Sequence, residues 1–149
     1  MEELSAYLAT HLISLKALES LGPVKAFCGM ISIVCLYGLL AGLLTTYWGP
    51  GAAGSGVAEL IGYLNGVDYK DFLGFKTLIT KILGVILAVN ARLCVGKEGP
   101  LAHIGANLGA MVLYIPGLGF EFLRNDDKKR QFICAGAAVG ISAAFGAPI

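Results

Sequence analysis

Two glycine-rich segments contain the residues whose types and spacing best suit chemistry. Residues 49–56 read GPGAAGSG, residues 96–100 read GKEGP, and each precedes a predicted helix. The first N–H groups of a helix lack intrahelical partners and carry partial positive charge, so they can bind an anion without a cationic side chain. Glycine has no Cβ to keep an ion away from the backbone. The pattern therefore predicts an anion site built from backbone amides.

Ser55 and Glu98 are the two side chains in these segments with a functional interpretation. Ser55 lies between Gly54 and Gly56, directly before the predicted helix. Its hydroxyl can cap that helix, which is the commoner use of serine there, or it can donate to a ligand. Glu98 can be solvated or paired with Lys97. Alternatively, its carboxylate can occupy the anion position at the helix N-terminus and leave when it is protonated.

Other chemistry-bearing residues favour structural roles. His103 follows one turn after Pro100; it can relay protons, but a hydrogen-bonded packing histidine is the commoner case. No catalytic constellation and no cofactor motif is predicted, because the GxGxxG at residues 49–54 lacks a surrounding βαβ pattern. The cysteines have no CxxC spacing, which predicts small buried residues rather than a metal site or a disulfide framework. They are Cys28, Cys35, Cys94 and Cys134.

The composition indicates that lipid surrounds the elements that position these residues. Of the 149 residues, 56% are hydrophobic and 14% are charged, against about 25% charged in an ordinary soluble domain. The mean hydropathy is +0.75. So few charges cannot cover the surface of a soluble globule, which argues against a soluble enzyme and makes the lipid bilayer the expected partner. A net charge of +1 gives no reason to expect nucleic acid.

Uncharged stretches locate the predicted membrane helices. Residues 26–58, 99–120 and 131–149 contain no Asp, Glu, Lys or Arg over 33, 22 and 19 residues, and a spanning helix needs about 20. Residues 76–92 form a fourth predicted span, in which Lys76, Lys81 and Arg92 lie toward the ends, where long basic side chains can reach the interface.

The rest of the chain divides into an amphipathic start, connections and packing motifs. Residues 1–21 have leucines at helical spacing between charges and predict a helix at the membrane surface. The mixed-charge run 124–130 predicts a solvated loop. Small residues four apart would let helices pack closely, whatever the function. These pairs are Gly38 and Gly42, Gly105 and Gly109, and Gly136 and Gly140.

Taken together, these motifs resemble the CLC family of chloride channels and chloride/proton exchangers. The resemblance covers residues 22–149 and rests on GSGVAE at 54–59, GKEGP at 96–100 and AGAAVGISAAFGAPI at 135–149, in that order. It implies an all-α, polytopic membrane fold with short or broken helices, corresponding to part of an inverted-repeat architecture. One position departs from the family pattern, because Ala58 stands where proline is common.

The resemblance implies a role for each matching residue. Ser55 would donate its hydroxyl to a central chloride, helped by the backbone around Gly54 and Gly56. Glu98 matches the gating glutamate, and the N–H of Gly99 would face an outer anion site. Lys97 and Pro100 complete that motif. The implied function is a voltage-gated chloride channel or a chloride/proton antiporter. Because a buried lysine would bind chloride too tightly for transport, we expect a site without a cationic side chain.

The resemblance also implies a larger context. Family members have two inverted halves, the second of which lies beyond the motifs found here, and they form homodimers with one pore per subunit. The stretch YLNGV at 63–67 resembles intracellular eukaryotic members, which implies a vacuolar or lysosomal type of membrane. Two alternatives remain open: a transporter of another substrate with similar broken helices, or a membrane scaffold subunit whose glycines serve packing alone.

Overall fold

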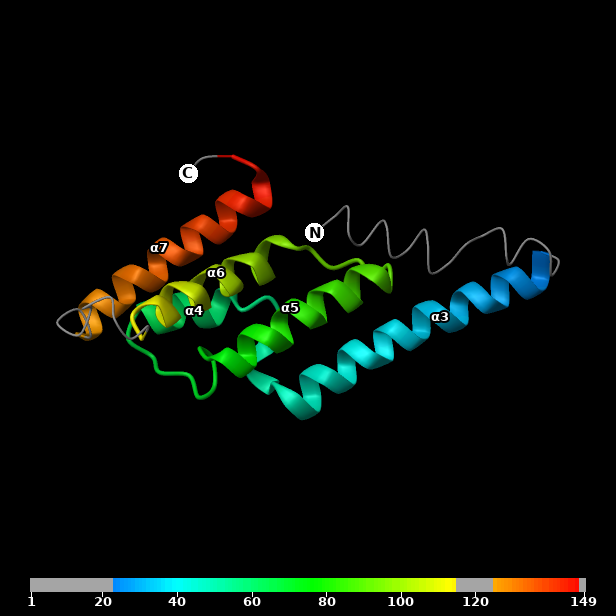
Figure 1. Ribbon diagram of the computed structural model, residues 1–149, viewed down its shortest axis with the longest axis horizontal. Coiled ribbons are helices and arrows are strands. Elements are labelled where there is room, and N and C mark those ends of the chain that lie inside the picture. Colours follow the sequence, from blue (N-terminus) through cyan, green and yellow to red (C-terminus); the bar gives the residue numbers. More distant parts are fainter. Residues whose placement is uncertain (1–22, 115–124, 148–149) are drawn as a thin grey trace.

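A computed structural model describes residues 23–114 and 125–147, and every regular element in these two ranges is a helix (Figure 1). The predicted amphipathic segment, residues 1–21, lies outside the described residues. The elements are α3 (Pro23–Leu43), the π-helical turn η1 (Leu44–Trp48), the 3-10 turn η2 (Pro50–Ala52), α4 (Val57–Leu64), α5 (Phe75–Asn90), α6 (Glu98–Val112) and α7 (Asp126–Phe145). The predicted all-α class with short helices is confirmed.

Among the described helices, only the one formed by α3 and η1 is long and apolar enough to cross a membrane. It covers Phe27–Trp48, with 22 residues and a mean hydropathy of 2.2. The other three predicted spans contain α5 with 16 residues, α6 with 15 and α7 with 20. By length and composition, one of the four predicted spans is therefore supported within the described residues. The length of an uncharged stretch gives only the maximum length of a helix within it. The actual length depends on where the capping and turn residues end the helix.

The helix α7 begins inside the mixed-charge run. Residues 126–130, predicted as a solvated loop, form its first turns instead. Asp126 and Asp127 lie in that first turn, where acidic side chains interact favourably with the helix dipole. The acidic residues therefore favour a helix start here. The charged residues at 126–130 also make the N-terminal part of α7 polar, so α7 is not apolar over its full length.

A seam of glycines joins α6 to α7, which lie side by side in Figure 1. A Cβ at Gly105 would collide with the Gly136 carbonyl oxygen, and a Cβ at Gly136 would collide with the Gly105 carbonyl oxygen. Gly109 and Gly140 meet backbone atoms across the same seam. Close packing was predicted for these two pairs and is confirmed. For Gly38 and Gly42 it is wrong, because an added Cβ at either position would meet no described atom within 4 Å.

The seam predicts a stability defect for Gly136→Ala in a full-length protein that contains this chain. The new methyl group must push the two helices apart, and overpacking of this kind costs on the order of 1–3 kcal/mol. We expect a lower melting temperature in detergent. Gly42→Ala is the matched control, since it adds the same methyl group to a helix without a collision. Equal melting temperatures for the two variants would contradict the seam.

Two buried polar side chains of α6 hold the segment that leads into α5. The Gly74 N–H donates to Asn107 Oδ1 at 2.7 Å, and His103 Nε2 lies 2.9 Å from the Phe72 carbonyl oxygen. His103 and Asn107 are both 0% exposed. Because buried polar atoms are costly unless they are paired, these contacts fix the start of α5 relative to α6.

Candidate anion site

The two glycine-rich segments meet in the structure. Gly99, in the first turn of α6, lies so close to Ser55 that a Cβ added at Gly99 would be 2.7 Å from Ser55 Cβ and 3.4 Å from Val57 Cγ2. Real Cβ atoms essentially never approach another heavy atom under 3.0 Å. A residue without a side chain is therefore required at position 99 for the segments to touch as they do.

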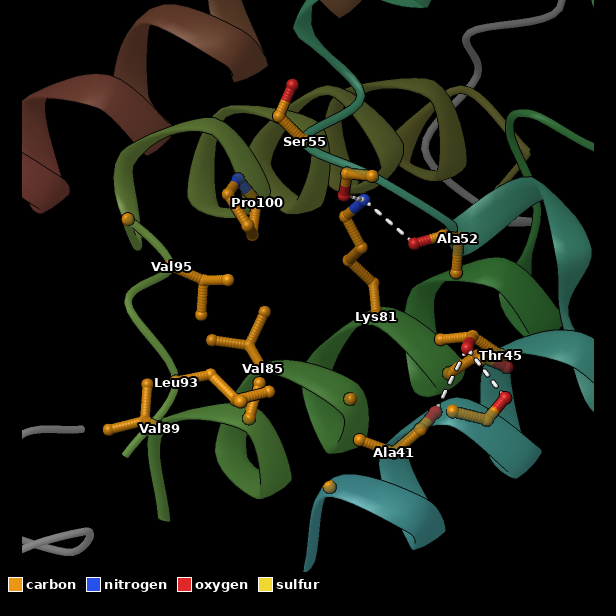
Figure 2. A pocket seen from close by; sticks show the side chains of 17 residues that line it. Ala41, Thr45, Ala52, Ser55, Lys81, Val85, Val89, Leu93, Val95 and Pro100 are labelled. Atoms are coloured by element: carbon orange, nitrogen blue, oxygen red, sulfur yellow. Dashed lines mark hydrogen bonds between the residues drawn. The ribbon is translucent and has the colours of Figure 1, made fainter. Parts of the chain in front are cut away.

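A cavity of about 460 Å³ opens between these segments, α3 and α5 (Figure 2). Of the predicted site residues, Gly54, Ser55 and Pro100 line it, together with Gly96. The other four predicted residues are close in sequence to lining residues but do not line the cavity themselves: Gly56, Lys97, Glu98 and Gly99. Both predicted segments thus contribute to one cavity wall.

Ser55 does not cap α4 as the local pattern favoured. The N-cap is Gly56, with φ +81° and ψ −1°, and no side chain caps the helix. The Val57 N–H donates to Ser55 Oγ at 3.4 Å, which is long for a hydrogen bond. Ser55 is exposed, and its side chain extends away from Lys81 in Figure 2. The helix begins where the sequence predicted, with Ala58 in its first turn.

Glu98 is the first residue of α6 and is partly buried. Its Oε2 lies 2.5 Å from the place where a Cβ of Gly96 would be, so the carboxylate lies back over that glycine. Lys97 is the N-cap, and its carbonyl accepts a hydrogen bond from the Leu101 N–H at 3.0 Å. Pro100 falls in the first turn, as predicted, where its missing N–H costs no intrahelical bond.

Lys81 is the residue of this region that the sequence reasoning placed wrongly. It is 3% exposed and lines the cavity, and its Nζ donates to the carbonyls of Ala52 at 3.0 Å and Gly54 at 2.7 Å (Figure 2). The Lys81 side chain is therefore turned into the protein instead of extending outward, and the cavity wall contains a basic side chain. Carbonyls of an irregular segment need donors, and here a lysine supplies them.

The contact of Lys81 with Gly54 orients a peptide group. In a planar trans peptide the C=O and N–H groups point in opposite directions. The Gly54 carbonyl points at Lys81, so the Ser55 N–H points away from it. A sequence signal for this arrangement exists in retrospect: Thr77, Thr80 and Lys81 form a buried polar stripe at helical spacing on α5.

The remaining sequence predictions have mixed outcomes. His103 is a packing histidine, as predicted: it is fully buried and hydrogen-bonded, and its ring stacks on Phe72 with centroids 4.3 Å apart. The burial of the cysteines is wrong, because all four are exposed and free. They lie on the outer faces of helices or in the loop after α5. Among the described residues, no group of three or more His, Cys, Asp or Glu side chains could hold a metal ion.

Comparison with known proteins assigns the family. A family model described as "Voltage gated chloride channel" matches residues 37–149, which include both glycine-rich segments. The chain belongs to the voltage-gated chloride channel family. The CLC resemblance seen in the motifs is thereby confirmed.

Relatives in the voltage-gated chloride channel family include both channels and exchangers by name. Chloride channel protein C of Dictyostelium discoideum is 41% identical over 133 residues, covering 84% of this chain and 17% of its own length. H(+)/Cl(-) exchange transporter 7 of Homo sapiens is 42% identical over 118 residues, covering 74% of this chain and 15% of its own length. A putative chloride channel-like protein CLC-g of Arabidopsis thaliana is 40% identical over 118 residues, with the same shares of 74% and 15%. The chain spans about a sixth of the length of these relatives, which are named as channels and transporters and not as enzymes.

Proposed function

We propose that the protein containing this chain moves chloride across a membrane, as a channel or as a chloride/proton antiporter. The chloride lies where residues 54–56 approach the first turn of α6. One observation carries this proposal: Gly99 touches Ser55, so the two segments with free helix-start amides lie together. Family membership and the relatives' names support chloride as the ion.

In this site, backbone and hydroxyl dipoles bind the chloride directly. The Lys81 ammonium does not contact the ion, because it bonds to the carbonyl side of the same backbone segment. The Ser55 N–H and hydroxyl, the backbone at Gly54 and Gly56, and the Gly99 N–H replace the water that the ion loses. Lys81 is already bonded to two carbonyls, and it sits on the carbonyl side of the Gly54–Ser55 peptide. Its charge therefore favours the anion through an intervening peptide and does not trap it by direct contact.

Glu98 is the gate and the proton-linked group. As the first residue of α6, its carboxylate competes with chloride for the helix start, and protonation removes the competing charge. Lys97 adds a positive side chain beside it, and Pro100 fixes the backbone of that turn. Proton binding and anion occupancy are then coupled, which suits either a voltage-gated channel with an acid-sensitive gate or an antiporter.

The wider context follows from the family. We place the protein as a homodimer with a pore in each subunit, as a multi-pass integral membrane protein, in an intracellular membrane of vacuolar or lysosomal type. Its partners are the lipid bilayer, chloride and protons. No cofactor, metal or nucleic acid enters the mechanism.

The test is Gly99→Ala in a full-length protein that contains this chain, measured as chloride, nitrate and potassium flux in proteoliposomes. The new methyl group must displace Ser55, so we expect chloride flux to fall by roughly tenfold and the preference over nitrate to weaken, because an anion site of this kind depends on sub-ångström placement. Gly74→Ala is the control: its φ of 167° is extended and nothing lies within 4 Å of the added Cβ.

Two outcomes would contradict the proposal. Potassium flux without chloride flux in the unmodified protein would favour a transporter of another substrate. A Gly99→Ala variant with lower yield but unchanged anion selectivity would favour a membrane scaffold whose glycines serve packing alone.

A further inference from the structure

His103 is one of two fully buried polar side chains, within the described residues, that the proposed mechanism leaves unused. It lies on α6, between the first turn that contains Glu98 and the buried Asn107, and it is 0% exposed. Its ring is nearly parallel to that of Phe72, with an interplanar angle of 12° and centroids 4.3 Å apart. A fully buried polar ring in a fixed orientation suggests a role beyond core packing.

The contacts of the ring define its tautomer. Nε2 lies 2.9 Å from the Phe72 carbonyl oxygen, and a carbonyl can only accept, so the proton of the neutral ring is on Nε2. Nδ1 then carries a lone pair, and it is buried without a hydrogen-bond partner among the described residues. Nδ1 faces Gly56, because a Cβ added at Gly56 would collide with Nδ1 and lie 2.8 Å from Cγ and 3.0 Å from Cβ of His103.

Gly56 is the last residue of the GSG turn and the N-cap of α4, with φ +81°. A left-handed residue at this place turns the chain from the Ser55 segment into α4. The His103 ring lies directly against it, and the ring in turn is held by the Phe72 carbonyl. The position of the turn is thus set against α6, the same helix that begins with Glu98.

We propose that His103 is a positioning residue of the anion site. Its imidazole holds the Gly56 turn, and with it the Ser55 hydroxyl and the first amides of α4, at a fixed distance from the first turn of α6. This inference rests on the proposed chloride site and names a side chain outside both motifs that determines the alignment of the two. The ring does this as a neutral donor at Nε2 and does not transfer protons.

The first experiment compares His103→Gln with His103→Leu in the full-length protein. Glutamine retains a terminal N–H₂ that can donate to the Phe72 carbonyl, whereas leucine does not. We expect His103→Leu to lower the melting temperature, because the Phe72 carbonyl loses its donor, and to reduce the chloride-over-nitrate preference by about tenfold, because the Ser55 segment is misplaced. His103→Gln should restore most of both. The response of flux to acid should persist in His103→Gln.

Each alternative result overturns the proposal. If both variants keep the wild-type selectivity, His103 does not align the site. If His103→Gln keeps selectivity and melting temperature but loses proton-coupled flux, the side chain relays protons instead. A wild-type protein without chloride flux would refute the proposed function, and the contact between Gly56 and His103 would then still be decided by the following cycle.

The second experiment is a double-mutant cycle on melting temperature, which remains informative if His103→Leu fails to fold. Gly56→Ala alone suffers both a strained left-handed backbone and a collision with the imidazole. In the His103→Ala background the colliding Nδ1 and Cγ are absent, so the backbone strain and the 3.0 Å approach to the retained Cβ of residue 103 remain. We expect Gly56→Ala to lower the melting temperature clearly less in that background. Equal effects in the two backgrounds would show that the ring does not hold the turn.

Discussion

Replacement of Glu98 by glutamine is expected to make chloride flux independent of acid. The proposed gate predicts that wild-type flux rises with acid, because a protonated Glu98 would no longer compete for the start of α6. Glutamine imitates the protonated side chain at every pH, so flux should be high and flat across the titration. A carboxylate at a helix N-terminus contributes on the order of 1 kcal/mol, which corresponds to roughly fivefold in anion affinity.

The matched control for this variant is Glu59→Gln. Glu59 also lies in the first turn of a helix, α4, and is also partly buried, but the proposed mechanism gives it no gating role. Flux in proteoliposomes should keep its acid dependence in Glu59→Gln and lose it in Glu98→Gln. The gating role of Glu98 would be wrong if the Glu98→Gln protein, present at normal levels, still responded to acid.

Local chemistry made several elements predictable from the sequence. The glycine-rich segments correctly predicted where α4 and α6 begin. A helix start depends on a few adjacent residues, such as the glycines before it and Pro100 in the first turn, so it can be read from local sequence. The pairing of Gly105 with Gly136 was predictable in kind, since small residues four apart form a flat helix face. Which small pairs would meet was not: Gly38 and Gly42 have the same spacing and face open space.

The predictions that failed depended on partners distant in sequence. The sequence predicts that Lys81 reaches the interface, because it precedes the uncharged centre of residues 76–92 and so lies toward one end of that predicted span. Its partners, the carbonyls of Ala52 and Gly54, are 29 and 27 residues away. His103 was correctly predicted as a hydrogen-bonded packing residue, but its contact with Gly56 could not be read from spacing. The 22-residue uncharged stretch 99–120 overestimated the length of α6, which has 15 residues, because uncharged residues continue past the helix end.

Replacement of Lys81 by methionine is expected to have the largest effect of any substitution in α5. Methionine has a similar unbranched shape and no donor, so the carbonyls of Ala52 and Gly54 lose their partner, at a cost of about 1–3 kcal/mol each. The Gly54–Ser55 peptide is then free to rotate, and the Ser55 N–H no longer has a fixed direction. We expect a lower melting temperature, a loss of chloride flux of more than about tenfold, and little remaining preference over nitrate.

Lys76→Met separates this effect from a general loss of positive charge. Lys76 lies on the same helix but is exposed, so removing its charge leaves the carbonyls of Ala52 and Gly54 paired with Lys81. Both flux and selectivity should then stay near wild type. If Lys81→Met kept normal selectivity in a well-folded protein, the peptide could hold its direction without the lysine. The hydrogen bonds of Lys81 to the two carbonyls would then serve only to satisfy a buried amine. They would have no part in binding the anion.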